Sequence, residues 1–266
     1  DGHAPMEAFV REAISRGFEA YGISSHAPFP VQNSCNMRRE RMEDYLDEFR
    51  RLKQIYSSEI ELYIGLEIDF LDDTFNPSIP YFQELPLDYR IGSVHYIVAP
   101  DGTPIDTDGP PSRFKDYVDT FFDGDVDEAV RRFYRSSSRM VELGGFDFLG
   151  HLDKIGLNAS LYRPGLDSEP WYRQLVFDYL DEIASRDLPV EVNTKAMEAR
   201  GRFFPHRDYF GTMRELGIRV VVNSDSHYPE KINSGRAEAL QALSQAGYTT
   251  VWQLSGGEWI ARPIEI

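Results

Sequence analysis

The chain has 266 residues, of which 41% are hydrophobic, so it is long and apolar enough for one α/β domain and is not a disordered chain. Lysine and arginine number 28 against 44 aspartates and glutamates, and the formal charge of -16 disfavours binding to nucleic acid or to an anionic membrane. The single cysteine, Cys35, excludes an internal disulfide and a cysteine-rich zinc site.

Short apolar runs alternate with amphipathic stretches in the first half of the chain. Apolar residues that recur at spacings of three and four predict helices, and short apolar runs between them predict strands. A Pro-, Gly- and Asp-rich segment, 99–112, is predicted to be a long loop, and loops of this length are often functional. In chain order the predicted elements are a helix over 6–16, a strand ending at His26, a helix over 39–56, and strands over 60–70 and 88–97.

The second half continues the alternation. Strands separated by helices pair in parallel through right-handed crossovers. A barrel and an open doubly wound sheet both fit this pattern. No glycine-rich phosphate loop follows the first strand, which favours the barrel. The predicted elements are helices over 125–143, 171–186, 206–216 and 237–246, and strands over 146–153, 188–194, 218–227 and 248–254.

Four of the six histidines fall at or just after the end of a predicted strand. In an α/β barrel the carboxyl ends of the strands share one face. A single histidine there is more simply a core residue, but four of them with neighbouring acids indicate a metal site. The four histidines are His26, His95, His151 and His227.

Carboxylates share this placement, and two of them stand two residues from a histidine. A spacing of two on a strand puts both side chains on the same face. The alternative for any one pair is an ordinary ion pair or a loop cap. The carboxylates are Glu67, Asp69, Asp153 and Asp225.

Imidazole and carboxylate ligands without a thiolate suit Zn, Fe or Mn. The candidates outnumber the four ligands of one tetrahedral ion, so we expect two to three divalent ions, with Glu67 able to bridge two of them. Such ions lower the pKa of a shared water and neutralise phosphate oxygens. The sequence therefore predicts hydrolysis of a phosphomonoester by metal-bound hydroxide, without a protein nucleophile.

The motifs GHA, GLEIDF, GSVHYI, GHLD, EVNT and NSDSH occur in this order, with a strand-end histidine after the first. Together they resemble the PHP (polymerase and histidinol phosphatase) superfamily over nearly the whole chain, and most of all its histidinol-phosphate phosphatase branch. The resemblance implies a distorted (β/α)7 barrel that forms one domain over 1–266. It also implies hydrolysis of L-histidinol phosphate to L-histidinol and phosphate in histidine biosynthesis. Another small-molecule or phosphotyrosine phosphatase of the superfamily is the alternative, and the acidic composition argues against a nuclease module.

The resemblance also implies roles for individual residues. It assigns Glu67 as the bridging ligand, Asp225 to the first ion, His95 and His151 to the second, and His26 and His227 to the third, with His3 as the remaining ligand.

Two departures from the family pattern concern the ends of strands. The family has an H-x-H pair on a first strand before GHA, whereas this chain begins at Asp1, so we expect that strand to lie upstream. We expect this chain alone to bind the first ion weakly, and an added H-x-H strand to raise its metal content. Ser25 stands where the family often has an acid, which removes a possible outer partner of His26.

Substrate contacts are predicted from the same strand ends. Where the family has an N-T-x-G-L run, this chain has NTKAMEARGR, so Lys195, Arg200 and Arg202 are candidate phosphate contacts, with solvated surface charges as the alternative. Asn193 is a candidate for orienting ligand or water, and Lys154 is a further candidate cation.

Three more predictions concern the remaining polar residues. Asp106 in the long loop is a candidate contact for the cationic part of the substrate, and Asp153 is expected to orient His151 or to relay a proton to the leaving alkoxide. His206 is expected at the surface. The sequence has no run of about 18 apolar residues and no signal peptide, which favours a cytoplasmic protein acting on a small molecule; its oligomeric state stays open.

Overall fold

The computed structural model describes residues 2–31 and 33–265, and its central feature is a six-stranded parallel sheet in the order β1-β2-β3-β6-β7-β8. All six carboxyl ends therefore lie at the same edge of the sheet. The predicted α/β class is confirmed. The strands are β1 (Ala20–His26), β2 (Glu61–Asp69), β3 (Tyr89–Ser93), β6 (Phe148–Leu149), β7 (Val190–Asn193) and β8 (Val220–Asn223).

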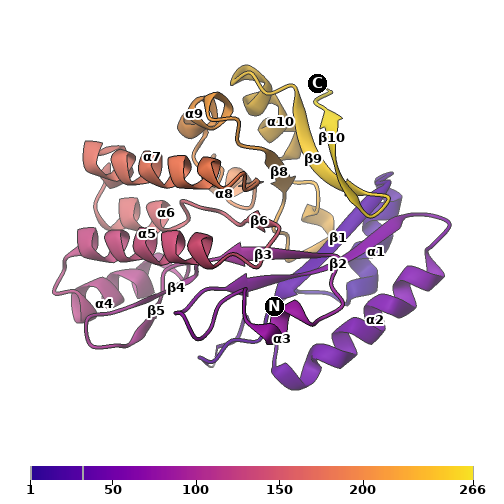
Figure 1. Cartoon of the computed structure of the whole chain (residues 1–266), viewed down its shortest axis with the longest axis horizontal. Coiled ribbons are helices and arrows are strands. Elements are labelled where there is room, and N and C mark those ends of the chain that lie inside the picture. Colours follow the sequence, from indigo (N-terminus) through magenta and orange to yellow (C-terminus); the bar gives the residue numbers. More distant parts are fainter. Residues whose placement is uncertain (1, 32, 266) are drawn as a thin grey trace.

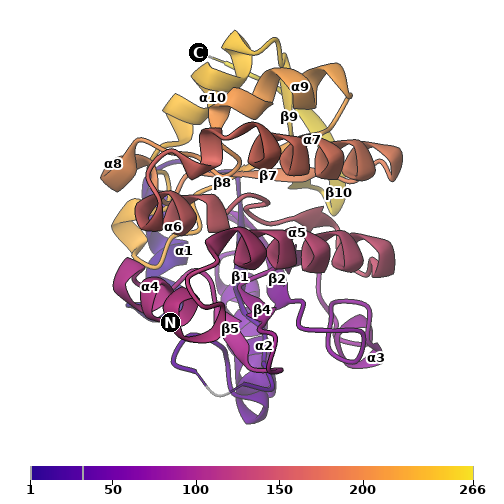
Figure 2. The same ribbon diagram turned by 90° about the vertical axis from the view of Figure 1, so that its left-hand side faces the viewer.

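Helices connect the strands and cover the outside of the sheet, with α5 and α7 side by side (Figures 1 and 2). Helix α5 begins where the Asp125 side chain accepts a hydrogen bond from the backbone N–H of Glu128. No helix in residues 2–31 and 33–265 is apolar over a length that would span a bilayer. The α-helices are α1 (Met6–Ser15), α2 (Met42–Ile55), α3 (Pro80–Gln83), α4 (Pro111–Phe121), α5 (Val126–Leu143), α6 (Ile155–Tyr162), α7 (Pro170–Ser185), α8 (Met197–Arg200), α9 (Phe210–Glu215) and α10 (Arg236–Gln245).

Four short 3-10 helices complete the helical segments: η1 (Arg39–Arg41), η2 (Leu166–Ser168), η3 (Arg207–Tyr209) and η4 (Pro229–Lys231).

Large side chains fill the inner face of the sheet at the end opposite the carboxyl ends of the strands. Tyr89 of β3 lies across its neighbours, where a Cβ on Gly65 would come within 2.4 Å of the Tyr89 ring and one on Gly22 within 2.6 Å of its hydroxyl. The two glycines therefore make room for one aromatic ring. This small cluster also contains Tyr63, Ile91, Phe148 and Val221.

Two predicted elements differ from the structure because the chain turns out of the main sheet. The predicted strand over 88–97 divides at Ser93, and β4 (Tyr96–Val98) pairs antiparallel with β5 (Pro104–Asp106). Part of the predicted loop 99–112 is therefore a strand. The last predicted strand is β9 (Thr250–Ser255), which forms a separate hairpin with β10 (Glu258–Pro263) through Gly256 and Gly257, both at positive φ.

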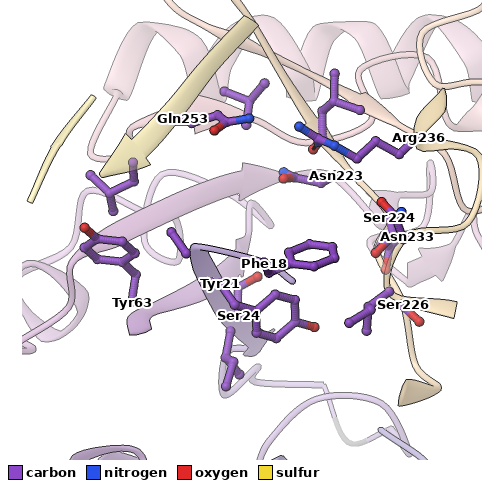
Figure 3. Close-up of a pocket in the computed structure, with 18 of the residues that line it drawn as sticks. Phe18, Tyr21, Ser24, Tyr63, Asn223, Ser224, Ser226, Asn233, Arg236 and Gln253 are labelled. Atoms are coloured by element: carbon purple, nitrogen blue, oxygen red, sulfur yellow. Dashed lines mark hydrogen bonds between the residues drawn. The ribbon is translucent and has the colours of Figure 1, made fainter. Parts of the chain in front are cut away.

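Among the described residues the sheet has two outer strands, β1 and β8. A cavity of about 800 Å³ lies between them and extends from His26, Glu67 and Asp225 to Trp252 and Trp259. Figure 3 shows Tyr21 and Ser24 of β1 on one side of this cavity and Asn223 and Arg236 on the other. The sheet is thus a partial barrel whose interior is accessible between β1 and β8.

Candidate metal centre

Parallel pairing of the first three strands brings predicted ligands to one edge of the sheet. His26, the last residue of β1, is in register with Glu67 of β2, and Asp69 at the end of β2 is in register with Ser93. His95 follows Ser93 by two residues. Residues that are 24 and 41 positions apart along the chain therefore pair at the same edge of the sheet, as the parallel fold predicts.

The carboxylate of Glu67 lies at the middle of this group. Its Oε1 is 2.9 Å from His151 Nε2 and 3.6 Å from His95 Nε2, and its Oε2 is 3.5 Å from His26 Nδ1. Glu67 is only 8% exposed. Three imidazoles around one buried carboxylate form a donor set suited to divalent zinc, iron or manganese.

His95 is held by a second carboxylate, Asp69, which is 1% exposed. Asp69 Oδ1 accepts a hydrogen bond from the His95 backbone N–H at 3.1 Å and lies 2.7 Å from His95 Nδ1. The Nδ1–H that donates to Asp69 leaves Nε2 directed at Glu67. A carboxylate behind a histidine ligand is a common outer partner in metal sites. The sequence placed Asp69 at a strand end but did not indicate this contact.

The charges of the group follow from burial and proximity. Burial works to raise the pKa of Glu67, but His26 and His95 outweigh it and hold the pKa well below its usual value. Burial lowers the pKa of His26 and of His151, so both rings are neutral near pH 7. For His95, burial is outweighed by Asp69 and Glu67, which raise its pKa to about 10. A metal ion that binds His95 therefore displaces a proton.

A second part of the centre is built on the loop after β8. Asp225 has φ of 47°, an uncommon conformation for a residue other than glycine. Its Oδ1 accepts a hydrogen bond from Lys195 Nζ at 3.1 Å, and its Oδ2 accepts one from Asn193 Nδ2 at 3.1 Å. Burial would raise the pKa of Asp225, but Lys195 and Lys154 outweigh it, so the carboxylate is ionised.

Glu191 of β7 is a buried carboxylate at this centre that the sequence analysis missed. It accepts hydrogen bonds from the His151 backbone N–H at 3.0 Å, from Asn193 Nδ2 at 3.0 Å and from Asn223 Nδ2 at 2.9 Å. Burial, reinforced by Asp225 and Glu67, raises the pKa of Glu191 to about 7. Its signal in the sequence was a lone acid between apolar residues in the predicted strand over 188–194.

The two remaining candidate histidines lie at the rim. The His227 ring is 6.3 Å from that of His26, and its Nδ1 is 3.2 Å from the backbone oxygen of Asp225. His3 is exposed, and its ring stacks on Tyr228 at 4.3 Å. Its backbone N–H donates to the His227 oxygen at 2.8 Å, so the structure brings the GHA segment to the His227 loop.

The prediction that Asp153 and His151 share a strand face is wrong, because β6 ends at Leu149. Asp153 is fully buried, and its Oδ2 accepts hydrogen bonds from Arg202 Nη2 and from the His206 backbone N–H, both at 3.0 Å. These hydrogen bonds tie two loops together and are not made to the His151 ring.

The prediction that Asp225 and His227 share a strand face is also wrong, because β8 ends at Asn223. Both side chains are placed by the loop after the strand, with Asp225 at positive φ. The loop, not strand alternation, brings them to the site.

Three further candidates lie outside the strands of the main sheet. Arg202 is buried against Asp153 and Asp167, which removes it from the predicted phosphate contacts. Arg200, the last residue of α8, is exposed. Asp106 Oδ1 accepts hydrogen bonds from the backbone N–H groups of Asp108 and Gly109, and burial raises the Asp106 pKa. His206 is half-exposed at the start of η3, as expected from the sequence.

This structure is a partial α/β barrel with imidazoles and carboxylates at the carboxyl ends of its strands. That arrangement is typical of the class of proteins that bind metal ions at this edge. The chain belongs to the PHP domain family, which matches residues 1–195. The distorted PHP-type barrel implied by the sequence resemblance is confirmed at the level of the fold.

Several known proteins are similar over most of their length. A relative from Deinococcus radiodurans named "Probable histidinol-phosphatase" is 28% identical, covering 94% of this chain and 91% of the relative. The histidinol-phosphatase of Bacillus subtilis is 24% identical, covering 84% and 87%.

Solved structures show the same fold. A protein from Listeria monocytogenes has a TM-score of 0.79 at 21% identity and covers 89% of this chain and 94% of its own. Histidinol phosphate phosphatase from Lactococcus lactis, solved with Zn, L-histidinol and phosphate, has a TM-score of 0.74 at 23% identity and covers 98% and 94%.

Proposed function

We propose that this chain is a metal-dependent phosphomonoesterase that hydrolyses L-histidinol phosphate to L-histidinol and phosphate. The observation that carries the proposal is the buried Glu67 carboxylate with three imidazoles around it, at the carboxyl edge of a PHP-type sheet. Relatives named histidinol-phosphatase align with most of the chain, which supports this substrate.

The residues present fit two to three divalent ions of Zn, Fe or Mn. Both oxygens of Glu67 lie near histidine rings, so Glu67 would be shared by two ions. His95 and His151 would help to hold one of these ions. Asp225 would hold another ion, and His26 and His227 would serve a third. We leave His3 out of the ligand set because its ring is exposed against Tyr228.

Bound divalent ions would supply Lewis-acid activation of the phosphate and of an attacking water near neutral pH. The protein residues supply position and charge. Asn193 fixes both Glu191 and Asp225, because its single amide group donates to each. Lys195, exposed at the mouth and 3.1 Å from Asp225, provides a cation where an anionic substrate enters.

Phosphate release by the purified zinc-loaded protein tests the proposal. The panel contains L-histidinol phosphate, a nucleoside monophosphate and phosphotyrosine, and kcat/KM is expected to be highest for L-histidinol phosphate. Glu67→Gln is expected to abolish turnover while the circular dichroism spectrum stays unchanged. A preference for phosphotyrosine, or full activity of Glu67→Gln, would overturn the proposal. The cytoplasmic location and the absence of a nucleic-acid partner stay predictions.

A further inference from the structure

Lys154 is a buried cation at the metal centre that the proposed ligand set does not use. Its side chain is 4% exposed and its Nζ is inaccessible to solvent, with the Asp108 carboxylate 3.2 Å away as its ion-pair partner. Lysine is rarely buried in this way, and an ammonium group has three N–H donors to satisfy. The ion pair with Asp108 leaves N–H donors of the ammonium available to a further acceptor.

The surroundings of Lys154 are those of an anion-binding group. Its Nζ is 3.2 Å from Asp108 Oδ2 and 3.7 Å from Asp225 Oδ2, so two carboxylates hold the charge. Nζ also lies over the Phe204 ring, 5.2 Å from its centroid. The ammonium is therefore held beside the centre by charge and by an aromatic wall.

The backbone joins Lys154 to the metal centre. Its N–H donates to the His151 backbone oxygen at 3.0 Å, within the turn that leads into α6. The His151 ring in turn contacts Glu67 at 2.9 Å. A ligand bound between Glu67 and Asp225 would thus find Lys154 at its edge, at a position fixed by the same turn as His151.

We infer that Lys154 Nζ binds a phosphoryl oxygen of the substrate, as the inner of two cations that flank Asp225. This inference rests on the proposed function. Lys195, the outer cation, has a side chain that is 36% exposed and already donates to Asp225. The inner ammonium loses little hydration when an anion arrives, because it is already out of water. A charge-assisted hydrogen bond from such a group is stronger than one from an exposed lysine.

The test compares Lys154→Met with Lys195→Met and with a surface control, Lys115→Met, in the full chain at saturating zinc. Lys115 pairs with Asp119 on the exposed face of α4. The measurements are competitive inhibition by inorganic phosphate, KM and kcat for p-nitrophenyl phosphate, bound zinc by mass spectrometry, and thermal unfolding. Lys154→Met is expected to weaken phosphate binding by about 10- to 100-fold, Lys195→Met by about threefold, and Lys115→Met not at all.

Unchanged phosphate inhibition in a folded, zinc-loaded Lys154→Met would overturn the inference. If this variant does not fold, Lys154→Gln decides, because it removes the charge and keeps a polar side chain. A loss of phosphate binding of about tenfold with zinc intact supports the contact, and phosphate binding equal to that of the parent overturns it. If the parent hydrolyses p-nitrophenyl phosphate but not L-histidinol phosphate, the proposed substrate is wrong, while the Lys154 inference is still judged by phosphate inhibition.

Discussion

Asp69 is the carboxylate that sets both the orientation and the proton affinity of His95. In Asp69→Asn the amide oxygen can still accept from His95, since the shape of the side chain is nearly unchanged. What is lost is the negative charge 2.7 Å from Nδ1. Removing the carboxylate partner of a histidine ligand typically lowers metal affinity by about 10- to 100-fold, or about 1.4–2.7 kcal/mol.

The charge also predicts a pH signature. Asp69 and Glu67 together raise the pKa of His95 to about 10 against the effect of burial, so metal binding to the parent releases a proton throughout the range from pH 7 to pH 9. In Asp69→Asn the pKa of His95 falls toward its ordinary value of about 6.5. Above pH 7 the slope of log zinc affinity against pH should then be smaller than in the parent, by up to about one decade per pH unit.

Zinc competition with a chromophoric chelator at pH 7, 8 and 9 measures both effects, and calorimetry in buffers of different ionisation enthalpy counts the protons released. The matched control is Asp181→Asn, an exposed position on α7. An affinity and slope equal to those of the parent would refute the role given to Asp69. Complete loss of one zinc equivalent would show instead that Asp69 is itself a ligand.

Three further predictions follow from buried groups. In the metal-free protein the pKa of Glu191 is raised to about 7 from 4.5. Ionisation of Glu191 therefore lowers the free energy of unfolding by about 3 kcal/mol as pH rises from about 4.5 through 7. Glu191→Gln should therefore raise the unfolding temperature at pH 8 but not at pH 4; an equal gain at both would contradict the assignment. Arg202→Met leaves Asp153 buried without its cation and should lower the free energy of unfolding by about 3–5 kcal/mol, much of which the double variant with Asp153→Asn should recover in urea unfolding. Gly65→Ala forces a Cβ to 2.4 Å from the Tyr89 ring and should destabilise by about 1–3 kcal/mol in urea, whereas Gly211→Ala in α9, with nothing within 4 Å, should be neutral or stabilising.

The periodicity of the chain was sufficient to predict the repeating units of the sheet. Helix α5 and strand β2 were located from local pattern, because a helix buries every third or fourth residue and a covered strand is apolar on both faces. The pattern failed at β4 and β5, since a short antiparallel hairpin is decided by pairing with a partner segment.

The candidate site likewise contains some residues that the sequence predicts and others that it does not. Glu67, His95 and His151 could be predicted as one group from the sequence, because the carboxyl ends of parallel strands share an edge whatever their separation along the chain. Where the chain leaves the strand, the direction of a side chain depends on the loop. Asp153 therefore points to Arg202, and Asp225 reaches the centre from a residue at positive φ.

Only the tertiary structure decided which charged groups are buried and what they face. The sequence marked Lys154 only as a candidate cation and did not mark Glu191. Their burial and contacts come from neighbours on other strands and loops: Asp108 and Asp225 for Lys154, Asn223 for Glu191. The physical reason is that the strength of an electrostatic contact depends on exclusion of water and on distance in space, and neither is a property of the local sequence.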